Sequence, residues 1–343
     1  MKTVLADITK GRDNNLDLIR FIAAIMVIFS HAFPIAQGIG VQDPLSVATN
    51  DQISFGSLAV STFFFYGGFL ICKSMHRCKQ GEIYFKARIV RIFPPLIGVT
   101  LVLTFGVGPI ITSLSLEEYF SNISTYRYLL NGLLILQHDL PGVFTNNIYA
   151  NTVNGPLWTL PIEFLCYIMC YIFYKLHLLE KKRMGVTIVL FSIGCFLVKM
   201  VSVRVLMLAS VIRPVGLFFA GMLYFVFSES IIMSSSIGWL CLIGGLLSIK
   251  MGVFNYTIFV FLPYFLMYIG YGIKKKASQF AKRGEISYGV YLCAWPIQQI
   301  ICQCFGGQMN PMLNFVLSIL PSIIMGTIIC KFVEEPLAKK MKR

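Results

Sequence analysis

One apolar stretch near the N-terminus, LDLIRFIAAIMVIFSHAF (residues 16–33), carries three ionisable side chains, those of Asp17, Arg20 and His31. In an α-helix, Arg20 and His31 share a face, because eleven residues at about 100° each end about 20° from three full turns. Asp17 lies about 40° from the same line. A neutral imidazole can take a proton from a hydroxyl near neutral pH. The sequence therefore predicts a general base at His31.

Lipid is a poor environment for these three groups, so their face is expected to line a protein-walled cavity. For Asp17 and Arg20 there is an alternative, a place at the membrane boundary with the arginine reaching out to water. His31 lies too deep for that explanation, and it is the only one of the four histidines inside an expected span.

A pair of arginines, Arg88 and Arg91, occurs in KARIVRIFPPL. Residues three apart are neighbours on one face if the segment is helical. Two guanidinium groups suit the oxygens of phosphate. The same residues would also serve as a charge anchor at the inner membrane face, so both interpretations stay open.

Glu163 is the one acidic residue of a fourth expected span, and it follows Trp158 in NGPLWTLPIEFLCY. A structural pairing with a neighbouring helix would explain it. In the functional alternative, Glu163 pairs with His31 or orients an acceptor, because both residues are expected in the outer half of the membrane.

The composition shows which elements must position these residues. Of 343 residues, 57% are hydrophobic and 13% are charged, and the mean hydropathy is +0.75, unlike a soluble domain. A bilayer core needs about 20 apolar residues per helix. We expect an all-α integral membrane protein, a single transmembrane domain over residues 1–343 without a fused soluble domain. The ten expected spans are residues 16–36, 56–72, 93–113, 157–174, 185–200, 211–228, 236–253, 256–273, 286–305 and 312–332.

The net charge of +14 fits this topology. With a cytoplasmic N-terminus, the inner segments hold most of the 29 basic residues, as the positive-inside rule requires, and both termini are expected in the cytoplasm. Nucleic acid is disfavoured as a partner, because the basic residues do not form one compact, aromatic-rich face. The basic residues that fall outside the inner segments are Arg127, Lys199, Arg204, Arg213 and Lys250.

The ten cysteines lack the paired spacing that is typical of metal sites. Neither a phosphate-binding loop nor a dinucleotide-binding fingerprint occurs. We therefore expect no metal and no bound cofactor.

Six segments together resemble the membrane acyltransferase-3 family, the bacterial O-acetylases that modify cell-surface polysaccharides. They follow one another in the family's order and run from end to end, which makes the resemblance specific. In chain order they are LDLIRFIAAIMVIFSHAF, FFFYGGFLI, ARIVRIFPP, GPLWTLPIEFLCY, ISYGVYL and VEEPLAKK.

This resemblance implies transfer of an acyl group, usually acetyl, from cytoplasmic acyl-CoA to a hydroxyl of a cell-surface or lipid-linked polysaccharide. The protein would be a multi-pass protein of the bacterial plasma (inner) membrane, with acetyl-CoA as co-substrate. By position, His31 would be the catalytic histidine, Arg20 its motif partner, and Arg88 and Arg91 the donor-phosphate contacts. Together with the residue patterns above, this makes His31 and Glu163 the catalytic candidates and Arg20, Arg88 and Arg91 the donor-binding candidates. Candidates for substrate binding or support of the site are Asp17, Asn154, Trp158, Ser287 and Tyr288.

Two positions depart from the family pattern. Many relatives have a histidine where this chain has Ala294, which argues against a mechanism with two histidines, and Gly67 replaces the usual serine. A competing function is a transporter or flippase for a lipid-linked glycan. A single deep histidine combined with an arginine pair favours chemistry over transport. The sugar, the hydroxyl, the acyl group and the oligomeric state are left open.

Overall fold

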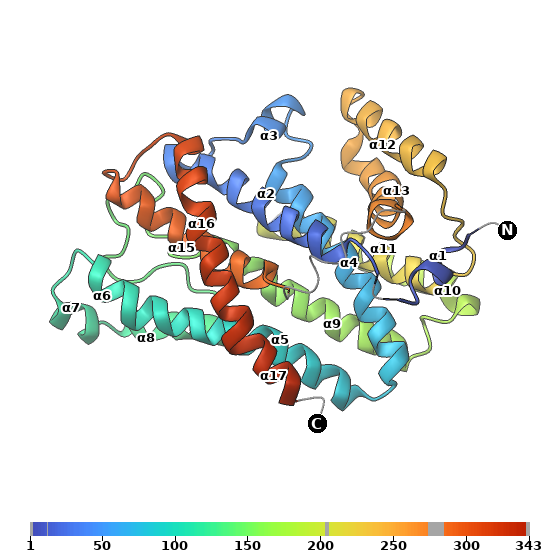
Figure 1. Ribbon diagram of the computed structural model, residues 1–343, viewed down its shortest axis with the longest axis horizontal. Helices are drawn as coiled ribbons and strands as arrows, with labels where there is room; N and C mark the ends of the chain where they lie inside the picture. Colours follow the sequence, from blue (N-terminus) through green and yellow to red (C-terminus); the bar gives the residue numbers. More distant parts are fainter. Residues whose placement is uncertain (1–2, 12, 203–205, 274–284, 341–343) are drawn as a thin grey trace. The chain divides into compact units, whose positions relative to one another are not determined.

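The protein is all-helical in the part that the structure describes, which is residues 3–11, 13–202, 206–273 and 285–340 of a computed structural model (Figure 1). No β-strand occurs among these residues. The longer helices are α2 (Leu16–Gln37), α4 (Phe55–Cys78), α5 (Gly81–Val102), α9 (Thr159–Lys175), α10 (Met184–Ser202), α11 (Leu206–Val226), α12 (Ser235–Lys250), α13 (Phe254–Met267), α15 (Ser287–Cys304) and α16 (Pro311–Ile329).

Short helical pieces connect or extend these helices. Three are π-helical, namely η1 (Leu103–Val107), η5 (Tyr268–Gly272) and η6 (Cys330–Glu334). Three are 3₁₀ turns, namely η2 (Tyr128–Leu133), η3 (Gly155–Trp158) and η4 (Lys181–Arg183). The short α-helices are α1 (Leu5–Ile8), α3 (Pro44–Ala48), α6 (Gly108–Ile111), α7 (Leu116–Ser121), α8 (Ile123–Arg127) and α17 (Glu335–Lys340).

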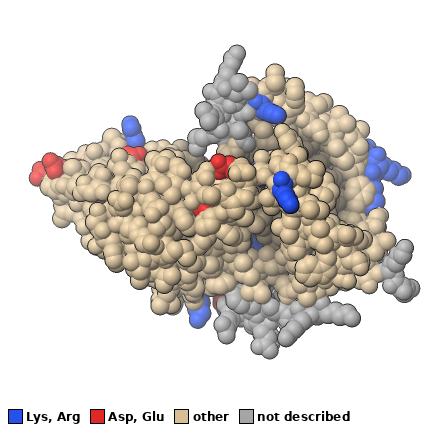
Figure 2. All heavy atoms as spheres, turned by 90° about the horizontal axis from the view of Figure 1, so that it is seen from above, with Lys and Arg blue, Asp and Glu red and all other residues tan. Residues whose placement is uncertain are grey.

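Seven helical stretches among the described residues are long and apolar enough to cross a membrane. Figure 2 fits this, because uncharged residues make up most of the face that it shows. The other three expected spans coincide with the apolar helices Ser210–Val226 and Ser235–Lys250 and with α15. The all-α prediction is thus confirmed, whereas ten spans and cytoplasmic termini stay predictions. The seven stretches are Leu16–Gln37, Phe55–Cys78, Gly81–Ile111, Gly155–Lys175, Lys181–Met200, Phe254–Gly272 and Pro311–Lys340.

Some of the basic residues that make up the charge pattern lie outside the described part of the chain. The basic residues outside the described part of the chain are Lys2, Arg12, Arg204, Lys274, Lys275, Lys276, Lys282, Arg283, Lys342 and Arg343.

The helices group into two compact units, which are described separately. Unit 1 consists of Met1–Arg20, Leu58–Phe85 and Ile162–Lys282, and unit 2 of Phe21–Ser57, Lys86–Pro161 and Arg283–Arg343. The chain passes from unit 1 to unit 2 within α2, between Arg20 and Phe21.

In unit 1, α4 and α11 approach each other closely through two glycines. A Cβ atom on Gly68 would lie 1.9 Å from the carbonyl oxygen of Phe218, and one on Gly221 would lie 2.1 Å from that of Phe65. Only glycine allows backbones this close. Gly67 is different, because a Cβ there would be 3.7 Å from the Phe218 ring. A Cβ atom at Gly67, where the family pattern has a serine, would therefore make an ordinary van der Waals contact.

In unit 2, buried amides tie α2 to α15 and α16 about one turn before His31. Gln298 donates from Nε2 to the carbonyl oxygen of Ile28 at 2.9 Å and to Oδ1 of Asn314 at 3.1 Å. Asn314 donates back to the carbonyl oxygen of Gln298 at 3.0 Å. Buried amide hydrogen bonds of this kind fix the register of packed helices, so they hold the part of α2 next to His31 against α15.

Candidate active site

His31 lies on α2, within unit 2, and its side chain is half-buried. The imidazole meets the indole of Trp295 on α15 edge to face, with ring centroids 4.9 Å apart and planes at 75°. Its Nδ1 atom is buried and has no hydrogen-bond partner in the described part of the chain. An unsatisfied buried polar atom costs about 1–3 kcal/mol, so this nitrogen is a natural place for a substrate group to bind.

A buried carboxylate, that of Asp43, lies close enough to interact electrostatically with His31. It caps α3 by accepting from the backbone N–H of Ser46 at 2.9 Å. It also accepts from the hydroxyl of Ser30 at 2.5 Å and from the backbone N–H of Phe55 at 3.0 Å. Sequence analysis missed Asp43, because an aspartate before a proline and a short helix is the usual signature of a cap.

Trp295 is held in place by the segment that precedes η3. Its Nε1 donates to the carbonyl oxygen of Thr152 at 3.0 Å, and a Cβ on Gly155 would lie 3.0 Å from its ring. Asn154 donates to the carbonyl oxygen of Leu292 on α15 at 2.9 Å. The predicted supporting residue Asn154 thus lies where it positions the helix that carries Trp295.

Two more residues that the sequence analysis singled out, Trp158 and Ala294, make no hydrogen bond to His31 among the described contacts. Trp158 ends η3 and is half-buried, whereas Ala294, at the position where many relatives have a histidine, is fully buried beside Trp295. A buried oxygen of Asn154, Oδ1, has no hydrogen-bond partner among the residues that the structure describes.

Arg91, on α5, sits between two carboxylates. Its guanidinium is 2.8 Å from Glu285 and 3.5 Å from Glu334, and it lies 5.8 Å from the centre of the Tyr288 ring. The Tyr288 hydroxyl donates to the carbonyl oxygen of Ile92 at 3.0 Å. The three segments ARIVRIFPP, ISYGVYL and VEEPLAKK therefore meet at this arginine.

The segment that carries Arg88 and Arg91 is helical, because both residues belong to α5. The two arginines are therefore neighbours on one face, as predicted. Arg88 is half-buried one turn before Arg91. Ser287, a predicted supporting residue, donates to Glu285 at 3.0 Å and so helps to hold the acid against Arg91. A phosphate group that binds Arg91 would have to compete with two resident carboxylates.

The remaining predicted residues, Glu163, Asp17 and Arg20, belong to unit 1. Glu163 accepts a hydrogen bond from the Tyr167 hydroxyl, one turn further along α9. Asp17, at the start of α2, interacts electrostatically with Tyr271, and Arg20 is half-buried. The predicted pairing of Glu163 with His31 stays a prediction.

An all-helical membrane protein with a histidine, an arginine pair and a glutamate on its apolar helices is the class that the fold and the site define. The chain belongs to the acyltransferase-3 family, since the family model, described as an acyltransferase domain, matches residues 13–333. The resemblance seen in the sequence is thereby confirmed.

Two relatives are similar to the chain. An O-acetyl transferase of Shigella phage Sf6 is 29% identical over 301 residues, which cover 84% of this chain and 86% of that protein. Nodulation protein 10 of Rhizobium leguminosarum bv. viciae is 28% identical over 167 residues, which cover 47% of this chain and 44% of that protein. The comparison with solved structures gave no match.

Proposed function

We propose that this acyltransferase moves an acetyl group from acetyl-CoA, bound from the cytoplasmic side, to a hydroxyl of a cell-surface or lipid-linked polysaccharide. Its place would be the bacterial plasma membrane. The family and the O-acetyl transferase of the phage support acyl transfer to oxygen. The observation that carries the proposal is the buried Nδ1 of His31, which has no hydrogen-bond partner in the described part of the chain.

In this mechanism, His31 takes the proton of the acceptor hydroxyl as its oxygen attacks the thioester carbonyl. The new C–O bond forms, the C–S bond breaks, and the proton passes from the imidazole to the departing CoA thiolate. Asp43 stabilises the imidazolium that forms in between, because its buried carboxylate acts on the ring. Trp295 packs against the ring in an edge-to-face contact. Glu163 would act on the base or on the acceptor.

The competing function, a flippase for a lipid-linked glycan, makes a different prediction for the purified protein. Reconstituted in vesicles with acetyl-CoA and a glycan acceptor, an acetyltransferase releases one CoA thiol for each ester that it forms. We expect both products in equal amounts, measured by thiol titration and by mass spectrometry of the glycan. Movement of glycan across the bilayer without ester would establish the flippase instead.

Changing Asp43 tests its electrostatic role. We expect Asp43→Asn to lower kcat by about 10- to 100-fold, less than the 100- to 10,000-fold that a general base supplies, with the KM for acetyl-CoA unchanged. The matched control is Asp51→Asn, in the same loop, because Asp51 is exposed and bonds only to Gln42 and Ser46 among the described contacts. Equal kcat in Asp43→Asn and wild type would remove Asp43 from the mechanism.

Two kinds of variant test the arginine pair, and they are expected to change the affinity for acetyl-CoA in opposite directions. Arg91→Ala or Arg88→Ala should weaken acetyl-CoA binding by about 10- to 100-fold, the loss of one charge-assisted hydrogen bond. Lysine should not fully rescue it, because a point charge cannot bind phosphate through two donors. Glu334→Gln should strengthen binding, because it removes a competitor 3.5 Å from Arg91. The measurement is calorimetry of the purified protein.

Lys86→Ala provides the control, since this lysine lies on the same helix and is exposed. Unchanged donor affinity in the double variant of Arg88 and Arg91 would show that the pair only anchors the helix.

A further inference from the structure

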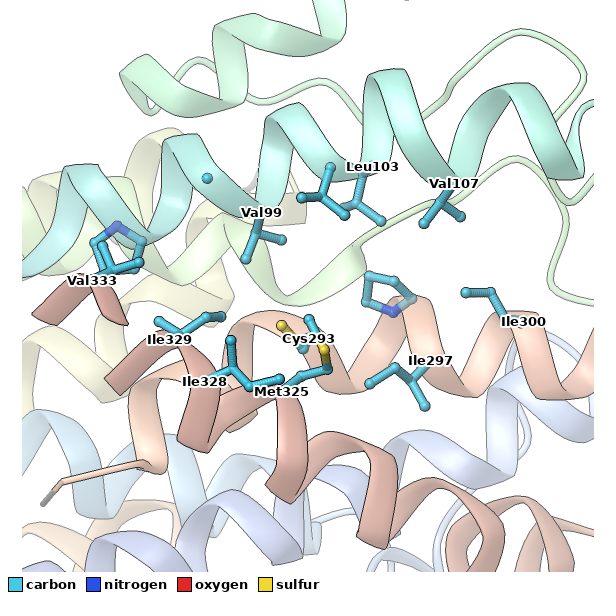
Figure 3. A pocket seen from close by; sticks show the side chains of 14 residues that line it. Val99, Leu103, Val107, Cys293, Ile297, Ile300, Met325, Ile328, Ile329 and Val333 are labelled. Atoms are coloured by element: carbon cyan, nitrogen blue, oxygen red, sulfur yellow. The ribbon is translucent and has the colours of Figure 1, made fainter. Parts of the chain in front are cut away.

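A groove that the chemistry does not use runs along one side of unit 2. Three walls enclose it: α5 together with η1, then α15, and finally α16 together with η6. Its volume is about 390 Å³, which is within the size range of ligand sites. Its walls are apolar side chains almost without polar surface. Figure 3 shows Val99, Leu103 and Val107 facing Ile297 and Ile329 across it.

The groove opens sideways, toward the lipid. Val102 on α5 and Ile328 on α16 both line it, and they are 54% and 43% exposed. Exposed apolar residues on spanning helices face hydrocarbon in a membrane. Membrane lipid can therefore enter without passing through water.

The groove does not suit the acyl donor. The arm of acetyl-CoA contains two amides, which would lose their hydrogen bonds with water against apolar walls. The groove also lies on the wrong side of α15. Cys293, Pro296, Ile297 and Ile300 line it, and at about 100° per residue Trp295, the partner of His31, points about 150° away from them.

The length of the groove matches one leaflet of a bilayer. From Pro95 to Val107 the helix rises about 18 Å, and half of a hydrocarbon core is about 15 Å. Charge begins only at one end, where Arg91 lies one turn before Pro95 and Glu334 directly follows Val333. Arg88 and Arg91 continue the face of α5 that lines the groove. An apolar groove that ends at charged groups matches an amphiphile, because the long apolar chain fits the groove and the polar head group fits the charged end.

We propose that this groove binds a fatty acyl chain of a membrane phospholipid, from the leaflet on the Arg91 side. The head group lies at the level of the cluster formed by Arg91, Glu285 and Glu334, and the chain runs along α5 toward Val107. The lipid does not react, because α15 separates it from His31.

Filling the groove tests the proposal. Gly98 lines it, and a Cβ there would have no atom within 4 Å, so Gly98→Phe puts a ring into open space. The matched control is Gly106→Phe, on η1, because Gly106 is exposed and does not line the groove. Native mass spectrometry of the purified proteins, without donor, should show a bound phospholipid in wild type and Gly106→Phe and its loss in Gly98→Phe. Equal retention in all three would overturn the proposal.

A second measurement uses the wild-type protein and so does not depend on the folding of a variant. A phosphatidylglycerol with a diazirine midway along one acyl chain should label residues 95–107 and 293–300 on irradiation. Excess unlabelled phospholipid should suppress this labelling. Labelling spread evenly over all exposed helices would refute a specific site, and suppression by a polyprenyl phosphate but not by phospholipid would refute the fatty acyl chain as occupant.

Discussion

His31→Ala is expected to abolish acyl transfer while the protein stays folded and inserted in the membrane. The rate should fall by about 100- to 10,000-fold, the contribution of a general base. Folding should change little, because the described contacts of His31 include no hydrogen bond and its edge contact with Trp295 contributes about 0.5–1.5 kcal/mol. His31→Gln should have the same effect on transfer, because an amide cannot accept the proton.

Mass spectrometry measures the amount of ester on the surface glycan. The amount of each variant in the membrane fraction shows whether the protein is folded and inserted. The control is His138→Gln, which changes an exposed histidine in the long connection before η3. Wild-type acetylation in either His31 variant would remove His31 from the chemistry, and equal loss in the control would show that histidine replacement harms the protein as such.

The sequence predicted the helices well because membrane thickness sets their length. Every expected span falls on a helix. The chain is helical over most of the stretch between the expected spans 56–72 and 93–113, because α4 continues to Cys78 and α5 begins at Gly81. The positive-inside rule indicates the side of the membrane on which charges lie, not the backbone conformation there. A helix can therefore continue beyond the lipid, and the point at which hydropathy falls does not show where the helix ends.

The site was predictable only within single helices. The shared face of Arg20 and His31 follows from helix periodicity, and the arginine pair follows in the same way. Asp43 could not be predicted as a neighbour of His31, because the path of the chain between α2 and α3 decides it. The ion pair of Arg91 with Glu334 could not be predicted either. The two residues are 243 positions apart, and only the packing of α5 against η6 brings them together.

Glu163→Gln is the second variant for which we expect a large effect. Transfer should fall by about 100-fold or more, the lower limit of an acid–base contribution, while acetyl-CoA binding stays unchanged. The amide keeps the size of the side chain and can still accept from the Tyr167 hydroxyl, so the variant removes the charge alone. Single-turnover transfer and donor calorimetry on the same preparation separate the two effects.

Tyr167→Phe distinguishes charge from structure. It removes the hydroxyl that donates to Glu163 but leaves the carboxylate and the Tyr84 hydrogen bond to the Tyr167 carbonyl oxygen, at 2.9 Å. If the charge acts on the base or the acceptor, Tyr167→Phe retains most of the transfer. Equal loss in both variants would mean that Glu163 only holds α9 in shape. A Glu163→Gln protein that loses donor binding but transfers normally at saturating acetyl-CoA would place the donor, not the acceptor, beside this carboxylate.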